Sequence, residues 1–309
     1  MSDFQFLVIG AGPGGYVAAL RAARLGLTTG IIENRQVGGT CLNRGCIPTK
    51  SLLHSASLLS AAQNGEQFGL LAENIGFDFS AIHRRKTEVV ELLRGGILQQ
   101  LKTAKVTLLV GTGVIVKPGL VRVGEQEYTA DHILIATGSV PAVPPIPGIH
   151  LPGVVTSDEL LCAPKPLYRS LVIIGGGVIG VELAGFYAAL GCEVTILEAM
   201  ERILPTMERE ISQSLAMVLK KRGIKIFTGC TVSALTEAED LTSIHYISKG
   251  TAETVVSQAV LCAIGRRPNT QGLLGEGLSL SMKQGRILVD ESFKTSLPNI
   301  YAIGDVSAK

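Results

Sequence analysis

One short pattern occurs twice in this chain, and positions 175 minus 10 and 198 minus 33 both give an offset of 165 residues. In each copy an apolar run leads into a G-x-G-x-x-G turn and a helix-forming stretch, and an acidic residue ends the next apolar run. The residues are Gly10, Gly12, Gly15 and Glu33 in the first copy, and Gly175, Gly177, Gly180 and Glu198 in the second. Such glycines allow a tight turn, close approach to a pyrophosphate and close helix packing, while the acid can bind ribose hydroxyls. The sequence therefore predicts an α/β fold with two Rossmann-like dinucleotide-binding domains.

The acid of the second copy indicates which nicotinamide cofactor binds there. The Glu198 carboxylate can accept a hydrogen bond from a free 2′-hydroxyl but repels a 2′-phosphate. Ala199 and Met200, which follow it, offer no cation for a phosphate. Arg202 lies four residues beyond Glu198 and is the residue that could reverse this preference. We expect NAD rather than NADP at the second site.

Two cysteines lie shortly after the first copy, in the run G-G-T-C-L-N-R-G-C-I-P-T-K that ends at Lys50. Cys41 and Cys46 are separated by four residues, and Pro48 can open a helix at its first turn. Cys46 would then lie near the positive end of a helix, which favours a thiolate. Lys50 would lie one helical turn further on, on the same face. This pattern predicts a redox-active thiol pair rather than a structural disulfide or two unrelated buried cysteines.

The cysteine run and the two glycine patterns together resemble the flavin-dependent pyridine nucleotide-disulfide oxidoreductases. The segment T-C-L-N-x-G-C-I-P is most similar to the dihydrolipoyl dehydrogenase branch, and the resemblance covers nearly all 309 residues. It implies FAD in the first site, NAD in the second, a redox disulfide between Cys41 and Cys46, and dihydrolipoamide on a lipoyl carrier domain as substrate. Cys41 would be the interchange thiol, and Cys46 would lie against the flavin.

Three alternatives bear on this interpretation. A glutathione or mercuric reductase would share the architecture, and a fragment that binds FAD and NAD without activity would share the motifs. The small thioredoxin reductases are excluded because their redox cysteines form C-x-x-C in the NAD domain.

The resemblance implies roles for further residues. Lys50 would pair with Glu182 near the flavin N5, the alternative being a solvated helix glutamate that the helix dipole favours. Asp305 would bind the ribitol chain of FAD, the alternative being a turn or cap residue. The other residues that the resemblance places at the cofactors are Gly39, Thr40, Thr137, Gly138, Gly265 and Gly304.

The expected domain order places one domain inside another. Residues 1–143 would form the first part of the FAD domain with the redox cysteines, and residues 144–270 would form the inserted NAD domain. Residues 271–309 would return to the FAD domain. The expected elements are helices near 46–62, 81–104 and 208–222, β structure over 106–128, and a β-meander over 224–260.

The chain stops four residues after Asp305, whereas family members continue into a dimer-interface domain with an acid–base histidine–glutamate pair. The resemblance thus implies that the full-length form is a homodimer and that this chain is a truncated core with an impaired thiol half-reaction. The five histidines are interpreted as surface or core residues: His54, His83, His132, His150 and His245.

Composition excludes several other classes of protein. The formal charge of +2 argues against nucleic acid and anionic membranes as partners. No apolar run approaches the roughly 18 residues of a membrane span, and the N-terminal apolar run is typical of a first strand rather than a signal peptide. We expect a cytoplasmic protein without a metal site. The remaining cysteines are expected to be buried small side chains: Cys162, Cys192, Cys230 and Cys262.

Overall fold

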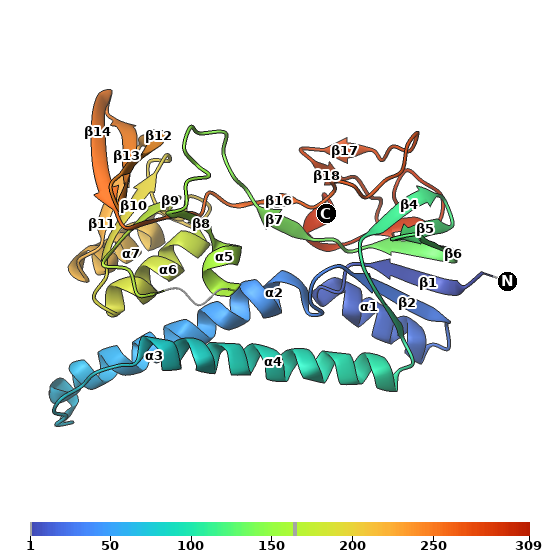
Figure 1. Ribbon diagram of the computed structural model, residues 1–309, viewed down its shortest axis with the longest axis horizontal. Coiled ribbons are helices and arrows are strands. Elements are labelled where there is room, and N and C mark those ends of the chain that lie inside the picture. Colours follow the sequence, from blue (N-terminus) through green and yellow to red (C-terminus); the bar gives the residue numbers. More distant parts are fainter. Residues whose placement is uncertain (1, 163–165) are drawn as a thin grey trace. The chain divides into compact units, whose positions relative to one another are not determined.

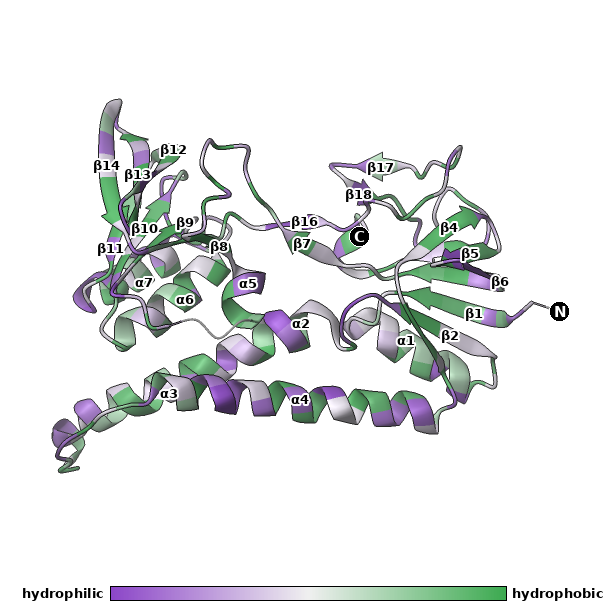
Figure 2. Ribbon diagram, viewed as in Figure 1, coloured by the Kyte–Doolittle hydropathy of each residue, from purple (hydrophilic) through white to green (hydrophobic). Residues whose placement is uncertain are grey.

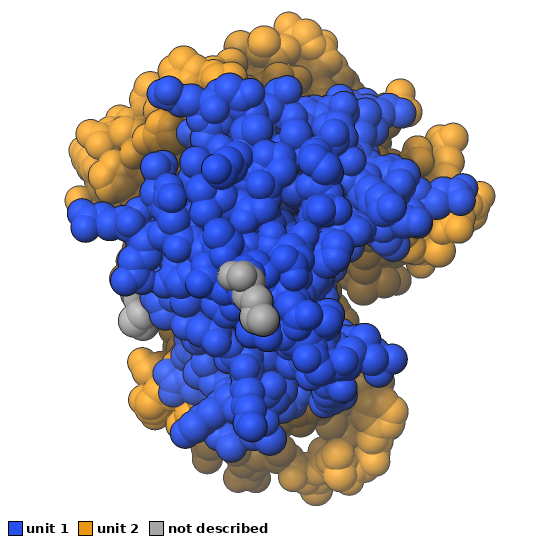
Figure 3. Space-filling view, turned by 90° about the vertical axis from the view of Figure 1, so that its right-hand side faces the viewer, with its two compact units in different colours: residues 1–47, 89–140, 266–309 blue, residues 48–88, 141–265 orange. Residues whose placement is uncertain are grey.

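The computed structural model describes residues 2–162 and 166–309 (Figure 1). The chain divides into two compact units, which Figure 3 distinguishes by colour. Unit 1 consists of residues 1–47, 89–140 and 266–309, and unit 2 of residues 48–88 and 141–265. The boundaries after residues 140 and 265 lie near the expected domain boundaries, but residues 48–88 belong to unit 2 rather than to the unit with the first glycine turn.

Unit 1 is built on a sheet whose central strand, β6, has two kinds of neighbour. The first half of β6 pairs with β5 in antiparallel orientation, and its second half pairs in parallel with β1 and β19. Since β19 comes from the end of the chain, the last segment returns to the first unit. In order across the sheet the strands are β3 (Thr107–Val110), β2 (Thr29–Glu33), β1 (Phe4–Ile9), β6 (Gln126–Ile135), β5 (Leu120–Val123) and β4 (Gly113–Lys117), with β19 (Ile300–Ala302) on β6.

Unit 2 is built on a sheet of five parallel strands, and a separate antiparallel sheet of three strands follows it. Across the parallel sheet the order is β11 (Lys225–Thr228), β10 (Glu193–Glu198), β9 (Ser170–Ile174), β15 (Ala259–Cys262) and β8 (Val154–Thr156). The antiparallel strands are β12 (Cys230–Ala238), β13 (Leu241–Ser248) and β14 (Thr251–Ser257).

The helices follow the predicted order closely. The longer ones are α1 (Pro13–Arg24), α3 (Cys46–Gln63), α4 (Phe79–Thr103), α6 (Val178–Ala189) and α7 (Arg209–Lys221), and the short ones are α2 (Gly39–Arg44) and α5 (Ser157–Cys162). The remaining short elements are η1 (Gly65–Phe68), β7 (Ser139–Pro141), β16 (Arg266–Pro268), β17 (Met282–Lys283), β18 (Arg286–Ile287) and η2 (Gly304–Val306). None of the helices in the described ranges combines the length and the hydropathy that crossing a bilayer requires.

The parallel strands are apolar along most of their length, as the hydropathy colouring in Figure 2 shows for β1, because both of their faces are buried. Successive residues therefore enter different cores. In β1, Leu7 belongs to one cluster of buried side chains and Val8 to another. In β9, Ile173 and Ile174 divide in the same way.

The predicted α/β class with two Rossmann-like units is confirmed, since β1–α1–β2 and β9–α6–β10 are both parallel βαβ arrangements. The predicted meander over residues 224–260 is wrong at both ends. Only β12 to β14 form it, while β11 and β15 join the parallel sheet. All four residues of β15 are buried, as expected for an inner parallel strand.

Candidate active site

The first glycine turn contains two glycines that the protein itself requires. Gly10 has a φ of +103°, and a Cβ there would lie 2.4 Å from Ala136 O. A Cβ on Gly15 would lie 1.9 Å from Gly10 O, so α1 could not pack on β1 with any larger residue. Among the described atoms, a Cβ on Gly12 would meet only Gly39 Cα, at 3.9 Å. The middle position thus leaves room for a ligand.

The second glycine turn repeats these contacts. Gly175 has a φ of +111°, and a Cβ there would lie 2.5 Å from Ala263 O. A Cβ on Gly180 would lie 2.1 Å from Gly175 O, whereas no described atom lies within 4 Å of one on Gly177. Gly12 and Gly177 are also the N-cap residues of α1 and α6, and neither helix has a side-chain cap. Uncapped N–H groups beside open space fit a pyrophosphate at each turn.

The acidic residues fasten both turns in the same way. Glu33 Oε2 accepts a hydrogen bond from Ala11 N at 2.9 Å, and Oε1 accepts one from Arg35 N at 2.8 Å. Glu198 Oε2 accepts from Gly176 N at 2.5 Å, and Oε1 accepts from Met200 N at 2.7 Å. Each carboxylate oxygen has two lone pairs, so both acids can still accept hydrogen bonds from ribose hydroxyls.

The two cysteines lie on two successive helices, α2 and α3. Cys41 is half-buried in α2, and Cys46 is the exposed first residue of α3. The helix therefore begins where the sequence predicted, with Cys46 at its positive end. Asn43 holds α2 in place, because its buried Nδ2 donates to the carbonyls of Val37 and Gly39, both at 2.9 Å.

Lys50 and Glu182 come together within unit 2, as the resemblance implied. Lys50 Nζ lies 2.5 Å from Glu182 Oε1 and links α3 to α6. The Lys50 side chain is 61% exposed and that of Glu182 is 28% exposed, so this ion pair is partly solvated. Its part in any reaction remains a prediction.

Four predicted cofactor residues of unit 1 lie in or beside one hydrogen-bonded group. Arg266 donates from Nε to Ser139 Oγ at 2.9 Å and from Nη2 to Thr40 Oγ1 at 3.3 Å. Ser139 Oγ in turn donates to Asp305 Oδ2 at 2.7 Å. Thr137 and Gly138 are tied to Asn269, whose carbonyl accepts from Thr137 Oγ1 and whose N–H donates to Gly138 O.

Arg266 and Ser139 were not singled out from the sequence as site residues. The available signal was a cation directly after Gly265 and a hydroxyl directly after Gly138. Gly265 itself, like Gly304, has a left-handed φ and no described atom within 4 Å of a built Cβ. These glycines thus serve backbone conformation.

The other cysteines are buried with one exception. Cys192, Cys230 and Cys262 are buried, and burial raises the pKa of the Cys192 thiol to about 12. The prediction that Cys162 is buried is wrong, because it is the last residue of α5 and is exposed.

Among the histidines, only His83 is buried in the described ranges. Desolvation, and after it the charge of Lys86, lowers the pKa of His83 to about 4. No group of three or more His, Cys, Asp and Glu side chains that could hold a metal ion occurs among the described residues.

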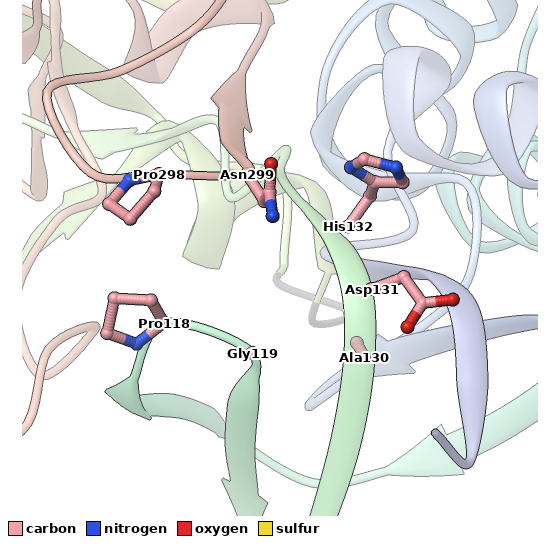
Figure 4. Close-up of a pocket in the computed structure, with 7 residues that line it drawn as sticks. All are labelled: Pro118, Gly119, Ala130, Asp131, His132, Pro298 and Asn299. Carbon is pink, nitrogen blue, oxygen red and sulfur yellow. The ribbon is translucent and has the colours of Figure 1, made fainter. Parts of the chain in front are cut away.

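A shallow pocket in unit 1 lies apart from the predicted site residues (Figure 4). The pocket lies where β19 begins. The glycine turn instead follows the end of β1, and β1 and β19 run in the same direction because both pair in parallel with β6. Ligands of open α/β sheets bind at the carboxyl ends of the strands, which this pocket does not adjoin. Its lining residues are Pro118, Gly119, Ala130, Asp131, His132, Pro298 and Asn299.

Comparison with known proteins gives one consistent family. Residues 4–309 match the model of the pyridine nucleotide-disulphide oxidoreductases. The chain is 41% identical to dihydrolipoyl dehydrogenase of Chlamydia pneumoniae, covering 99% of this chain and 66% of that protein. It is 40% identical to dihydrolipoyl dehydrogenase of Geobacillus stearothermophilus, covering 98% of this chain and 65% of that protein. The chain therefore spans slightly less than two thirds of the length of these relatives.

A solved structure agrees with this result. The Cu(II) complex of the flavoprotein disulfide reductase RclA from Escherichia coli matches with a TM-score of 0.87 and 34% identity, covering 99% of this chain and 66% of that one. The dihydrolipoyl dehydrogenases of this family use FAD and NAD(H), and both glycine turns of the chain fit a dinucleotide. The chain belongs to the pyridine nucleotide-disulphide oxidoreductase family.

Proposed function

We propose that this chain carries the FAD and NAD sites of a dihydrolipoyl dehydrogenase, which moves electrons between dihydrolipoamide and NAD⁺ through Cys41 and Cys46. The main supporting observation is the pair of glycine turns, whose middle glycines face open space beside uncapped helix ends. Two nucleotide sites and a thiol pair in one chain suit an enzyme that couples thiol and hydride chemistry.

The first turn would hold FAD, and the second would hold NAD. At the first site, Gly12 and the start of α1 would receive the pyrophosphate, Glu33 a ribose, and Asp305 the ribitol. Arg266 would order this region, since it ties Ser139, the partner of Asp305, to Thr40. FAD, when bound, supplies the chemistry that passes an electron pair between a dithiol and a nicotinamide.

The two thiols would carry the substrate half of the reaction. A thiolate of dihydrolipoamide attacks the Cys41–Cys46 disulfide at Cys41, which releases Cys46 as a thiolate. The second substrate thiol then displaces Cys41, so lipoamide leaves as a disulfide and the protein holds two reduced sulfurs. The helix dipole favours the thiolate on Cys46, the first residue of α3. Glu182 would fix the ammonium of Lys50 one turn further along the same helix.

The proposal is tested by two assays on the purified chain loaded with FAD. Reduction of NAD⁺ by dihydrolipoamide, with little reduction of oxidised glutathione by NADPH, would support it. The reverse preference would assign the chain to a glutathione reductase. Absence of a bound-flavin spectrum after incubation with FAD would contradict both. In the full-length form we also propose a homodimer and a lipoyl carrier domain as the partner.

A second candidate function is suggested by the structural comparison, because the E. coli relative is a Cu(II) complex. The same thiol pair could bind a thiophilic metal ion, with NADH supplying two electrons that reduce two Cu(II) to two Cu(I). Formation of Cu(I), measured with a Cu(I)-specific chelator, would then require NADH and Cys41. Equal Cu(I) formation by Cys41→Ser would exclude this candidate.

A further inference from the structure

In both copies the chain that leaves the second strand folds back onto the glycine turn. Gly38 N donates to Ala11 O, and Leu204 N donates to Gly176 O, both at 2.8 Å. Ala11 and Gly176 are each the second residue of their turn, so the two hydrogen bonds correspond. The donors differ in kind, however: φ is +98° at Gly38 and +46° at Leu204. Glycine adopts this conformation without steric cost, whereas a leucine is strained in it.

Leu204 is held in this strained conformation from several directions. Its side chain is buried, and its carbonyl accepts hydrogen bonds from Met207 N at 2.9 Å and from Ser212 Oγ at 3.1 Å. Ser212 is itself buried on α7. Strain of this kind persists only where the surroundings determine it, and it concentrates at functional sites.

The loop that contains Leu204 explains why the second turn has an additional glycine, Gly176, at its second position. Gly176 does not have a left-handed φ, so its backbone conformation would permit a side chain. An added Cβ would nevertheless lie 2.8 Å from Ile203 Cγ2 and 3.1 Å from Glu198 Oε2. The first copy has Ala11 at this position. Gly176 thus gives Ile203 and the Glu198 carboxylate the space to lie directly on the turn.

The same loop also restrains the side chain of Arg202 through a hydrogen bond. Arg202 Nη2 donates to Pro205 O at 3.0 Å, and its Nε is buried without a hydrogen-bond partner in the described part of the chain. Because Leu204 lies between these two residues, its conformation also sets the distance between them.

We propose that Gly176, Ile203 and Leu204 are positioning residues that determine how the second site discriminates between pyridine nucleotides with and without a 2′-phosphate. This inference rests on the proposed function, in which the second turn binds NAD.

Two consequences of the loop produce the discrimination. Glu198 is held on the N–H of Gly176, so it presents a fixed acceptor and a fixed negative charge to the ribose. Arg202 remains bonded to Pro205, so its cation does not offset that charge. A looser loop would hold the Glu198 carboxylate less firmly against the ribose and would let the Arg202 guanidinium leave Pro205. Both changes favour binding of the phosphorylated nucleotide.

The test uses Gly176→Ala in the full 309-residue chain loaded with FAD, so that the first turn is occupied, and measures binding rather than turnover. Calorimetric titrations with ADP-ribose and with 2′-phospho-ADP-ribose read the second site without any flavin reaction. We expect ADP-ribose to bind roughly 10- to 100-fold more weakly, as for loss of a charged hydrogen bond, while 2′-phospho-ADP-ribose changes much less. The control is Gly185→Ala, the same substitution on α6, where no described atom lies within 4 Å of the added Cβ.

A second variant, Leu204→Gly, removes the buried side chain that packs the loop in place and gives the backbone more freedom to leave this conformation. We expect it to lower the ratio of the two affinities in the same direction. Equal weakening of both ligands in Gly176→Ala, with an unchanged ratio in Leu204→Gly, would overturn the inference and leave NAD at the second site. If the unaltered chain binds neither ligand, or prefers the phosphorylated one, the assignment of that site to NAD is itself wrong.

Discussion

The two glycine turns agree in nearly every contact made inside the protein and diverge as soon as the chain leaves the second strand. Both turns place the first glycine against the carbonyl of the residue that directly follows a parallel strand, and the third glycine against the first. Both acids accept hydrogen bonds from two backbone N–H groups. These shared contacts are those that shape a turn around a pyrophosphate.

The divergent segments give each site its own chemistry. After Glu33 the chain forms α2 with Cys41 and α3 with Cys46 at its start. After Glu198 it forms a closed loop, anchored by Leu204, and no cysteine follows until Cys230, which is buried. Under the proposed function, a duplicated unit would yield a thiol-coupled site and a nucleotide-selecting site through the few residues beyond each acid.

The largest expected effect is a difference between two reactions of this chain, the oxidation of NADH and the oxidation of dihydrolipoamide. Thiol attack needs a proton acceptor, and none of the five histidines was identified as one. We expect the 309-residue chain to oxidise NADH with an artificial acceptor when FAD is bound. Its turnover of dihydrolipoamide should be lower than that of a full-length relative by roughly 10²- to 10⁴-fold, the usual contribution of a general base. Near-full turnover would mean that a proton acceptor exists within these residues.

Cysteine variants sharpen the same separation. Cys46→Ser should abolish the remaining dihydrolipoamide reaction and spare NADH oxidation, because only the first segment supplies thiols. Cys162→Ser is the matched control, since Cys162 is also exposed and terminates a helix, but lies outside the cysteine run. Loss of NADH oxidation in Cys46→Ser would contradict the separation.

Acid pH should lower the free energy of unfolding of unit 2, because His83 is buried in it. The pKa of His83 is about 4 in the folded chain and about 6.5 when unfolded. The unfolded state therefore binds more protons between these values, so stability falls as pH decreases through this window. The loss should reach about 3 kcal/mol below pH 4. Urea titrations at pH 7 and pH 4.5, compared with His83→Leu, measure it. An equal loss in His83→Leu would assign the effect to other groups.

The sequence allowed the glycine turns and the start of α3 to be predicted because each depends on a short motif with a known use. The pairing of Lys50 with Glu182 was expected only from the family resemblance. The group around Arg266 was not predicted, since Thr40, Ser139 and Asp305 come from distant segments that only the fold brings together. Cys162 was misjudged because its apolar neighbours suggested burial, whereas its place at a helix end decided its exposure.

Short apolar runs were the other source of error. Residues 225–228 and 259–262 could be recognised as strands, but the pattern of a short strand does not tell a parallel partner from an antiparallel one. The structure places both in the parallel sheet, because β11 follows the crossover helix α7 and β15 is buried on both faces.

A smaller effect is expected at the nucleotide-selecting segment. Glu198→Ala combined with Ala199→Arg removes the repulsion of a 2′-phosphate and adds a cation. We expect the NADH-to-NADPH preference to fall by roughly 10- to 100-fold, as for loss of a charged hydrogen bond, in steady-state assays with an artificial acceptor. Glu193→Gln, at the exposed start of the same strand, is the control. If the unaltered chain already accepts both nucleotides equally, Glu198 does not select between them.

The smallest effect is expected at the ion pair that links α3, which begins with Cys46 of the first divergent segment, to α6 of the second glycine turn. Glu182→Gln keeps the size of the side chain and removes the charge that holds Lys50. Since Lys50 is 61% exposed, solvent screens the pair, and an exposed pair typically contributes about 0.2–1 kcal/mol. We therefore expect flavin reduction by NADH to slow only about twofold to fivefold, with the FAD content retained. Stopped-flow absorbance measures this rate directly. An unchanged rate would mean that Glu182 is only a residue that the dipole of α6 favours. The second glycine turn and the cysteine at the start of α3 would then be coupled through the cofactors alone.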